Sequence, residues 1–179
     1  MPLDYLEFKG LRVNRGHPFI DIIGELLDYK NASCRALNRL FDQIRSIFEF
    51  IYISPFYSYR TAEVFPKFAL LPVLIVLSYY EPEQWYEVKC GRSFSCVYNL
   101  ASHSERFINQ LDSSIIEINE STSDESLISE KSRRAFVEGV CALIYIGKLN
   151  DPRVEAVNKG SFLFANTFAD VFFTLRVQD

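Results

Sequence analysis

The stretch FALLPVLIVLSYYEP, residues 68–82, is among the most apolar segments of the chain, and its role decides the fold. Its charge-free part, from Phe68 to Tyr80, is 13 residues long, whereas a membrane-spanning helix needs about 20. Lys67 precedes this part and Glu81 follows it. We therefore exclude a membrane span here, and we expect either a core helix or an apolar surface offered to another protein.

The composition predicts one compact domain with a large core. The chain has 179 residues, 49% of them hydrophobic and 15% aromatic, which argues against global disorder. It contains only 7 Gly, fewer than a sandwich or barrel with many tight turns is expected to need. The N-terminus lacks the apolar stretch of a secretory signal, so we expect a reducing compartment and no disulfides. The four cysteines, which show no paired spacing, are expected to be small core residues: Cys34, Cys90, Cys96 and Cys141.

Apolar residues that recur at intervals of three and four predict a mainly α fold, a compact multi-helix single domain. Pro66 and Pro72 are expected to bend or break a helix that begins near Thr61. Residues 161–175 are apolar nearly all round and are expected to be a buried helix, with a strand as the alternative. The other helices are expected at 18–29, 33–53, 83–88, 93–111, 125–147 and, more briefly, from Asp151 to Gly160.

The predicted domain, residues 1–179, has two helical parts joined by a polar linker. The N-terminal part covers residues 1–111, and the C-terminal part covers residues 125–179. Between them, residues 112–124 are polar and acidic and are expected to pack poorly. Thr122 and Glu125 have the spacing of a capping box at the start of the second part.

The charge pattern disfavours a direct contact with nucleic acid. The net charge is −4, and a protein that binds nucleic acid through its phosphates normally presents a basic face. The densest basic cluster, Lys131, Arg133 and Arg134, is expected to be a solvated helix face. We therefore expect no tight binding of small RNA duplexes.

No motif for catalysis or for a cofactor is found in the sequence. It has neither a phosphate-binding loop nor a glycine-rich dinucleotide motif, and GRSFS at 91–95 lacks the last glycine of a nucleophile elbow. The histidines are His17 and His103. Cys90, Cys96 and His103 are separated by five and six intervening residues, which matches no common zinc site. We expect no catalytic residue, no cofactor and no metal.

The stretch that opens this section also contains a candidate interaction motif. Leu71-Pro72 is followed by Leu74 and Ile75, and Pro82 comes after six further residues. A proline in the first helical turn costs no hydrogen bond, and aliphatic residues at helical spacing form a face that fits an apolar groove. A buried helix with a proline kink is the alternative. Pro82 either closes the motif or ends the helix.

Leu-Pro followed by spaced aliphatic residues resembles the start of an F-box, and the wider chain resembles the P0 proteins of poleroviruses and enamoviruses. The resemblance includes QIRSIFEFIYISPFYSYRTAEVFPKFALLP at 43–72, which leads into the F-box-like element at about 68–90. Trp85 and Cys90-Gly91 follow. It resumes with AFVEGVCALIYIGKLNDPRVEAVNKGSFLFANTFADVFF at 135–173.

The resemblance implies a viral suppressor of RNA silencing that acts as an F-box-like adaptor. Such a protein recruits host SKP1, and with it the cullin ubiquitin ligase, and directs ARGONAUTE proteins to degradation. Leu71, Pro72 and Ile75 would contact SKP1, with Leu74 facing the core and Pro82 as the closing proline. The expected location is the host cell cytoplasm, with the nucleus as a second possibility.

Two other interpretations stay open. One is a compact helical viral decoy, similar to Bcl-2-like proteins, in which residues 134–147 would form the central buried helix. The other is a soluble helical interaction domain without an assigned role.

Overall fold

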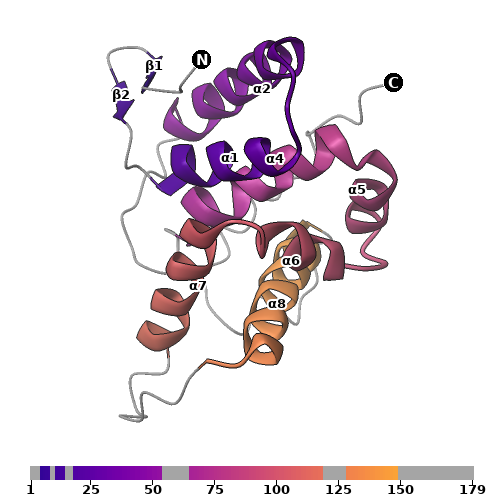
Figure 1. The fold of residues 1–179 in the computed structure, drawn as a ribbon. Coiled ribbons are helices and arrows are strands. Elements are labelled where there is room, and N and C mark those ends of the chain that lie inside the picture. The colour runs from indigo at the N-terminus through magenta and orange to yellow at the C-terminus, as the bar shows by residue number, and fades with distance from the viewer. Residues whose placement is uncertain (1–4, 9–10, 15–17, 54–64, 119–127, 149–179) are drawn as a thin grey trace.

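The computed structural model describes residues 5–8, 11–14, 18–53, 65–118 and 128–148, and the grey trace in Figure 1 marks the rest. Its elements, in chain order, are β1 (Tyr5–Phe8), β2 (Leu11–Asn14), α1 (Pro18–Tyr29), α2 (Cys34–Ile53), the π-helical turn η1 (Phe65–Leu70), α4 (Leu71–Tyr80), α5 (Pro82–Lys89), α6 (Ser95–Ala101), α7 (Glu105–Ile118) and α8 (Glu130–Lys148). The prediction of a mainly α domain is confirmed. The short hairpin of β1 and β2, antiparallel with Tyr5 opposite Asn14, was not predicted.

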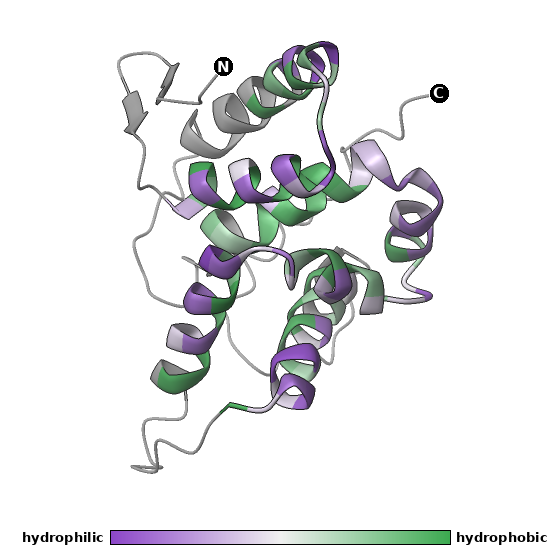
Figure 2. Cartoon of the chain, in the orientation of Figure 1, coloured by the Kyte–Doolittle hydropathy of each residue, from purple (hydrophilic) through white to green (hydrophobic). Residues whose placement is uncertain are grey.

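Helix α4 lies at the centre of the described fold. All residues from Leu71 to Ser78 are buried, and the helix packs against α1, α5, α6 and η1, with a smaller contact to α2. A helix that is apolar all round is stable in water only when other elements cover every side of it. Figure 2 shows α4 in the apolar colour, whereas the helices around it carry hydrophilic residues on their outer sides.

The two prolines of the central stretch begin helices instead of breaking them. Pro72 stands where η1 passes into the first turn of α4, and Pro82 stands in the first turn of α5, after the non-helical Glu81, where a missing N–H removes no intrahelical bond. The predicted break near Pro66 and Pro72 is replaced by η1, which leads directly into α4. The short joint at Glu81 ends α4 and lets α5 turn away (Figure 1).

Several predicted helices are confirmed with nearly the predicted bounds. Helix α1 matches 18–29, α2 matches 33–53, and α5 includes 83–88. Helix α8 begins at Glu130, later than predicted, because the Ser129 hydroxyl caps it by accepting the Ser132 N–H at 3.1 Å. The described part of α8 extends to Lys148, one residue beyond the predicted end at Gly147.

The single helix predicted over 93–111 is wrong, because the chain forms α6 and α7 with a turn at residues 102–104 between them. The Ser104 hydroxyl accepts the Phe107 N–H at 3.0 Å and donates to Glu25 Oε2 of α1 at 2.6 Å. The same Glu25 oxygen accepts the Arg106 N–H at 3.1 Å. Glu25 therefore caps α7 from a distant part of the sequence, which makes a new helix start favourable here.

The predicted linker at 112–124 begins too early, since α7 continues to Ile118. The rest of that linker, the helix start at Thr61, the capping box of Thr122 and Glu125, and the helices expected from Asp151 onward lie outside the described residues, as does His17. None of the helices in the described part has both the length and the apolarity required to cross a membrane.

Candidate functional site

The structure places the predicted SKP1-binding residues on one helix, and that helix is the core. The side chains of Leu71, Leu74 and Ile75 are 0% exposed, and Pro72 is buried as well. Pro82 is half-buried at the start of α5. Of the two roles considered for this stretch, the core helix is the one observed. A contact of SKP1 with Leu71, Pro72 and Ile75 stays a prediction, and it requires these side chains to leave the core.

The F-box-like element expected at about 68–90 consists mainly of α4 and α5. Trp85 is 0% exposed and, with Val88 one turn later, fixes α5 against the core. Gly91, just after α5, has a φ of +67°, a conformation that favours glycine. A Cβ at Gly91 would lie 2.5 Å from the ring of Tyr145 in α8, so the aromatic ring also requires glycine here.

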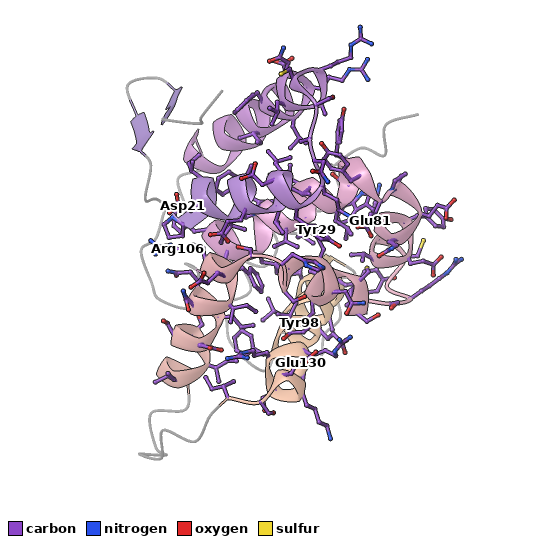
Figure 3. The ribbon with its side chains drawn as sticks, in the orientation of Figure 1. Asp21, Tyr29, Glu81, Tyr98, Arg106 and Glu130 are labelled. Atoms are coloured by element: carbon purple, nitrogen blue, oxygen red, sulfur yellow. The ribbon has the colours of Figure 1, made fainter. Side chains whose placement is uncertain are left out.

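The end of α1 contacts both the α4–α5 joint and the turn between α6 and α7. Lys30 forms an ion pair with Glu81 at the joint between α4 and α5. Its neighbour Tyr29 stacks on His103 of the turn between α6 and α7, with ring centroids 3.7 Å apart. Figure 3 shows Tyr29 and Glu81 near each other on this side of the molecule. The ion pair thus links the end of α1 to the α4–α5 joint, and the ring stack links it to the α6–α7 turn.

The outer side of α5 presents an exposed aromatic residue together with a cation. Tyr86 is 52% exposed, and the Arg92 guanidinium carbon lies 5.6 Å from the centroid of its ring. Glu87 orients that guanidinium through a 3.0 Å hydrogen bond, which raises the pKa of Arg92. The sequence analysis did not identify this pair. The sequence feature that could have revealed it is the helical spacing of the apolar residues Trp85 and Val88, which places Tyr86 on the outer side of α5.

The basic cluster near the start of α8 is only partly a solvated face. Arg133 donates two hydrogen bonds of 2.7 Å to the carboxylate of Asp112 in α7. Arg134 lies with its guanidinium carbon 5.1 Å from the ring centroid of Tyr98 in α6. Lys131 is exposed, as predicted. The two arginines thus hold α8 to its neighbours, and Figure 3 shows Tyr98 beside the start of α8.

The cysteines differ in exposure, contrary to the prediction that all four are core residues. Cys141 is buried and Cys34 is exposed, while Cys90 and Cys96 are intermediate. Burial raises the pKa of the Cys141 thiol, and burial together with Glu81 raises that of Cys96 to about 11. In the ranges that the structure describes, no group of three His, Cys, Asp or Glu side chains is placed to hold a metal ion.

Comparison of this chain with models of protein families, with curated proteins and with solved structures found no match. The site is therefore characterised by its own geometry. Helices α4 and α5 bury their aliphatic residues, and Tyr86 of α5 is exposed beside Arg92, which follows α5. Tyrosine and arginine are residue types that often anchor protein–protein contacts.

Proposed function

We propose that the protein is an F-box-like adaptor of viral origin. It recruits host SKP1 with its cullin ubiquitin ligase and directs ARGONAUTE proteins to degradation, which suppresses RNA silencing in the cytoplasm or nucleus of the host cell. In this role the chain is a scaffold between two proteins, and the ligase supplies the catalysis.

One observation carries this proposal. The Leu71-Pro72 pair, Trp85 and Gly91 are far enough apart to belong to separate elements, yet they lie in one packed unit formed by α4 and α5. Pro72 begins the first helix of the unit, Trp85 anchors the second, and Gly91 ends it against Tyr145. These few positions, which are part of the resemblance to P0 proteins, thus have a structural reason for their residue type.

The burial of α4 favours another part of this unit as the surface for SKP1. Exposing fully buried aliphatic side chains costs about 1.5–3 kcal/mol each, so SKP1 is expected to bind without opening the core. The part of the unit that a partner reaches directly is the outer side of α5 with Tyr86 and Arg92. We expect Leu71, Pro72 and Ile75 to support this surface from inside the core.

Co-expression with plant SKP1 followed by size-exclusion chromatography tests the proposal. The wild-type chain is expected to co-elute with SKP1. Tyr86→Ala is expected to weaken the complex about thirtyfold if Tyr86 is a hot spot worth about 2 kcal/mol. Ile116→Ala is the matched control, because Ile116 on α7 is 64% exposed and lies outside the α4–α5 unit. Separate elution of the wild-type chain and SKP1 contradicts the proposal.

A second candidate function is a helical decoy that binds a helix of a host signalling protein. It is favoured by one observation, that the surface of α6 and α7 already seats an amphipathic helix, α8. The central helix is α4, however, and not residues 134–147 as the sequence suggested, since α8 lies at the edge of the described fold (Figure 1). Recovery of a BH3-type peptide instead of SKP1 in binding assays supports this candidate.

A further inference from the structure

The outer side of α5 combines an exposed aromatic ring with groups of both charges. Figure 1 shows α5 at an edge of the described fold. Tyr86 is 52% exposed, and Glu83 and Arg92 are exposed as well. Glu83 precedes Tyr86 by three residues, so it lies one turn earlier on the same side of the helix. Arg92 follows the end of α5, and the charge along this side therefore changes from negative at Glu83 to positive at Arg92.

Arg92 is held in place although most of its side chain is exposed. Its Nη1 donates a 3.0 Å hydrogen bond to Glu87 Oε1, and its guanidinium carbon lies 5.6 Å from the centroid of the Tyr86 ring. The side chain is nevertheless 59% exposed. A long side chain normally loses conformational entropy when a partner binds it. Because Glu87 and Tyr86 already restrict Arg92, a partner has less of this entropy to remove.

The guanidinium of Arg92 also keeps hydrogen-bond donors for a partner. Arginine has five N–H groups, and within the described ranges the bond to Glu87 uses one of them. Arg35 and Arg39 of α2 are exposed too, but the described part of the chain supplies no hydrogen bond or ion pair that orients their guanidinium groups. Three other arginines form ion pairs and are only 26% to 40% exposed: Arg106, Arg133 and Arg134. Arg92 thus combines orientation with access.

We propose that the outer side of α5 binds a peptide segment of the partner protein in which a carboxylate lies next to an apolar side chain. The carboxylate accepts hydrogen bonds from the N–H groups of Arg92 that Glu87 leaves unused. The apolar side chain packs on the exposed ring of Tyr86. This inference rests on the proposed function for the choice of α5 as the partner surface, and it adds the chemistry that this surface recognises.

The two glutamates favour a peptide over a nucleic acid as the occupant. Tyrosine and arginine also bind single-stranded RNA, through base stacking and phosphate contacts. An RNA strand, however, brings several phosphates close to Glu83 and Glu87, and the net charge of −4 adds to the repulsion. A peptide can bring a single carboxylate to Arg92 and leave Glu83 free, or place a cation beside it.

An NMR titration with two blocked peptides tests the inference. One peptide contains Phe-Glu and the other Phe-Gln, so they differ by a charged carboxylate against a neutral amide of similar size. We expect both the Tyr86 amide signal and the Arg92 Nε–H signal to shift with the Glu peptide, which should bind about three- to tenfold more tightly than the Gln peptide. The preference should disappear in Arg92→Gln and remain in Arg39→Gln, the matched control on α2.

The variant Glu87→Ala separates the orientation of Arg92 from the charge of the surface. Removing this carboxylate makes the surface more positive, so charge attraction alone predicts tighter binding of the Glu peptide. We expect weaker binding, by about twofold or more, because Arg92 is no longer held over Tyr86. Thermal midpoints near that of wild type check that both variants are folded, since the substituted side chains lie at the surface.

Four results overturn the inference: equal affinity of the wild-type protein for the two peptides, no binding of either at millimolar concentration, unchanged or tighter binding by Glu87→Ala, or tighter binding of a short single-stranded RNA than of the Glu peptide. Co-elution with SKP1 tests the adaptor function separately. If SKP1 does not co-elute but the Arg92-dependent preference for the Glu peptide is found, the adaptor function is wrong and the inference stands. If SKP1 co-elutes and the peptides bind equally, the inference alone is wrong.

Discussion

Helices α4 and α8 are both apolar enough to need a partner surface, but they are held in different ways. Helix α4 is buried from Leu71 to Ser78 and is covered by several elements. Helix α8 buries one apolar stripe against α6 and α7. It also forms an ion pair with α7, between Arg133 and Asp112. The difference shows how a stretch that looks suited to bind a partner can be the core, while a peripheral helix carries the specific contacts.

Removing side-chain volume from α4 should have the largest effect. Leu74 is 0% exposed, and Leu74→Ala is expected to lower the free energy of unfolding by about 2–5 kcal/mol through lost burial and a cavity. Chemical denaturation measures this loss. Ile116→Ala, on an exposed part of α7, is the control and should change stability by less than about 0.5 kcal/mol. A small loss for Leu74→Ala would show that α4 is not the core.

The next largest effect is expected where α8 meets the end of the α4–α5 unit. Gly91→Ala introduces a Cβ at a left-handed position, which costs about 1–2 kcal/mol, and places it against the ring of Tyr145. We expect a loss of about 2–4 kcal/mol in denaturation experiments. Gly24→Ala in α1 is a matched control, because a Cβ there meets nothing within 4 Å. Equal stability of the two variants would contradict the close contact between Gly91 and Tyr145.

The ion pair that holds α8 should contribute less. A double-mutant cycle with Asp112→Ala and Arg133→Ala is expected to give a coupling free energy of about 1–2 kcal/mol, since the pair is bidentate and mostly shielded. The pair of Arg134 and Glu130, at 3.8 Å and more exposed, is the comparison, with coupling below about 0.5 kcal/mol. Similar values for both pairs would show that Arg133 does not anchor α8.

A smaller, pH-dependent effect is expected at Cys96 in α6, which lies between the two regions. Burial and the nearby Glu81 raise the pKa of its thiol to about 11, above the ordinary value of 9.0. Because the folded state favours the protonated thiol, the stability that it contributes is complete below pH 9 and is lost as pH rises toward 11. Thermal midpoints between about pH 8 and about pH 10.5 should therefore fall less for Cys96→Ala than for wild type. An equal fall in both proteins would contradict the raised pKa.

The spacing of apolar residues and the nearby helix-ending residues were enough to predict the bounds of α1 and α2. Helices α1 and α2 have one apolar side and neighbouring stop signals, so their bounds follow from spacing. The start of α7 has a local signal that the sequence analysis did not use, because the Ser104 hydroxyl accepts the Phe107 N–H. The second cap, Glu25, lies 79 residues before Ser104 and leaves no mark in the local sequence.

The sequence predicted that residues 71–75 are an apolar helical element, but it could not predict that their side chains are buried. The sequence indicated an apolar helical element at Leu71, Pro72 and Ile75, and α4 has Pro72 in its first turn, while their contact with SKP1 stays a prediction. Periodicity cannot tell a covered apolar helix from an exposed one, since that depends on which helices pack around it. The contacts of Arg133 with Asp112 and of Tyr86 with Arg92 likewise form only when the elements are in place.

Native-state hydrogen exchange of the full chain tests most directly whether α4 is the enclosed core and α8 a helix at the edge of the described fold. The amides of Ile75, Val76 and Leu77 are expected to exchange only with global unfolding, so their free energy of exchange should equal that from denaturation. Amides in the middle of α8, such as those of Val137 and Cys141, should exchange with a lower free energy. Exchange of α4 before α8 would contradict this account, because the Leu71-Pro72 element would then open while the edge of the fold stays closed.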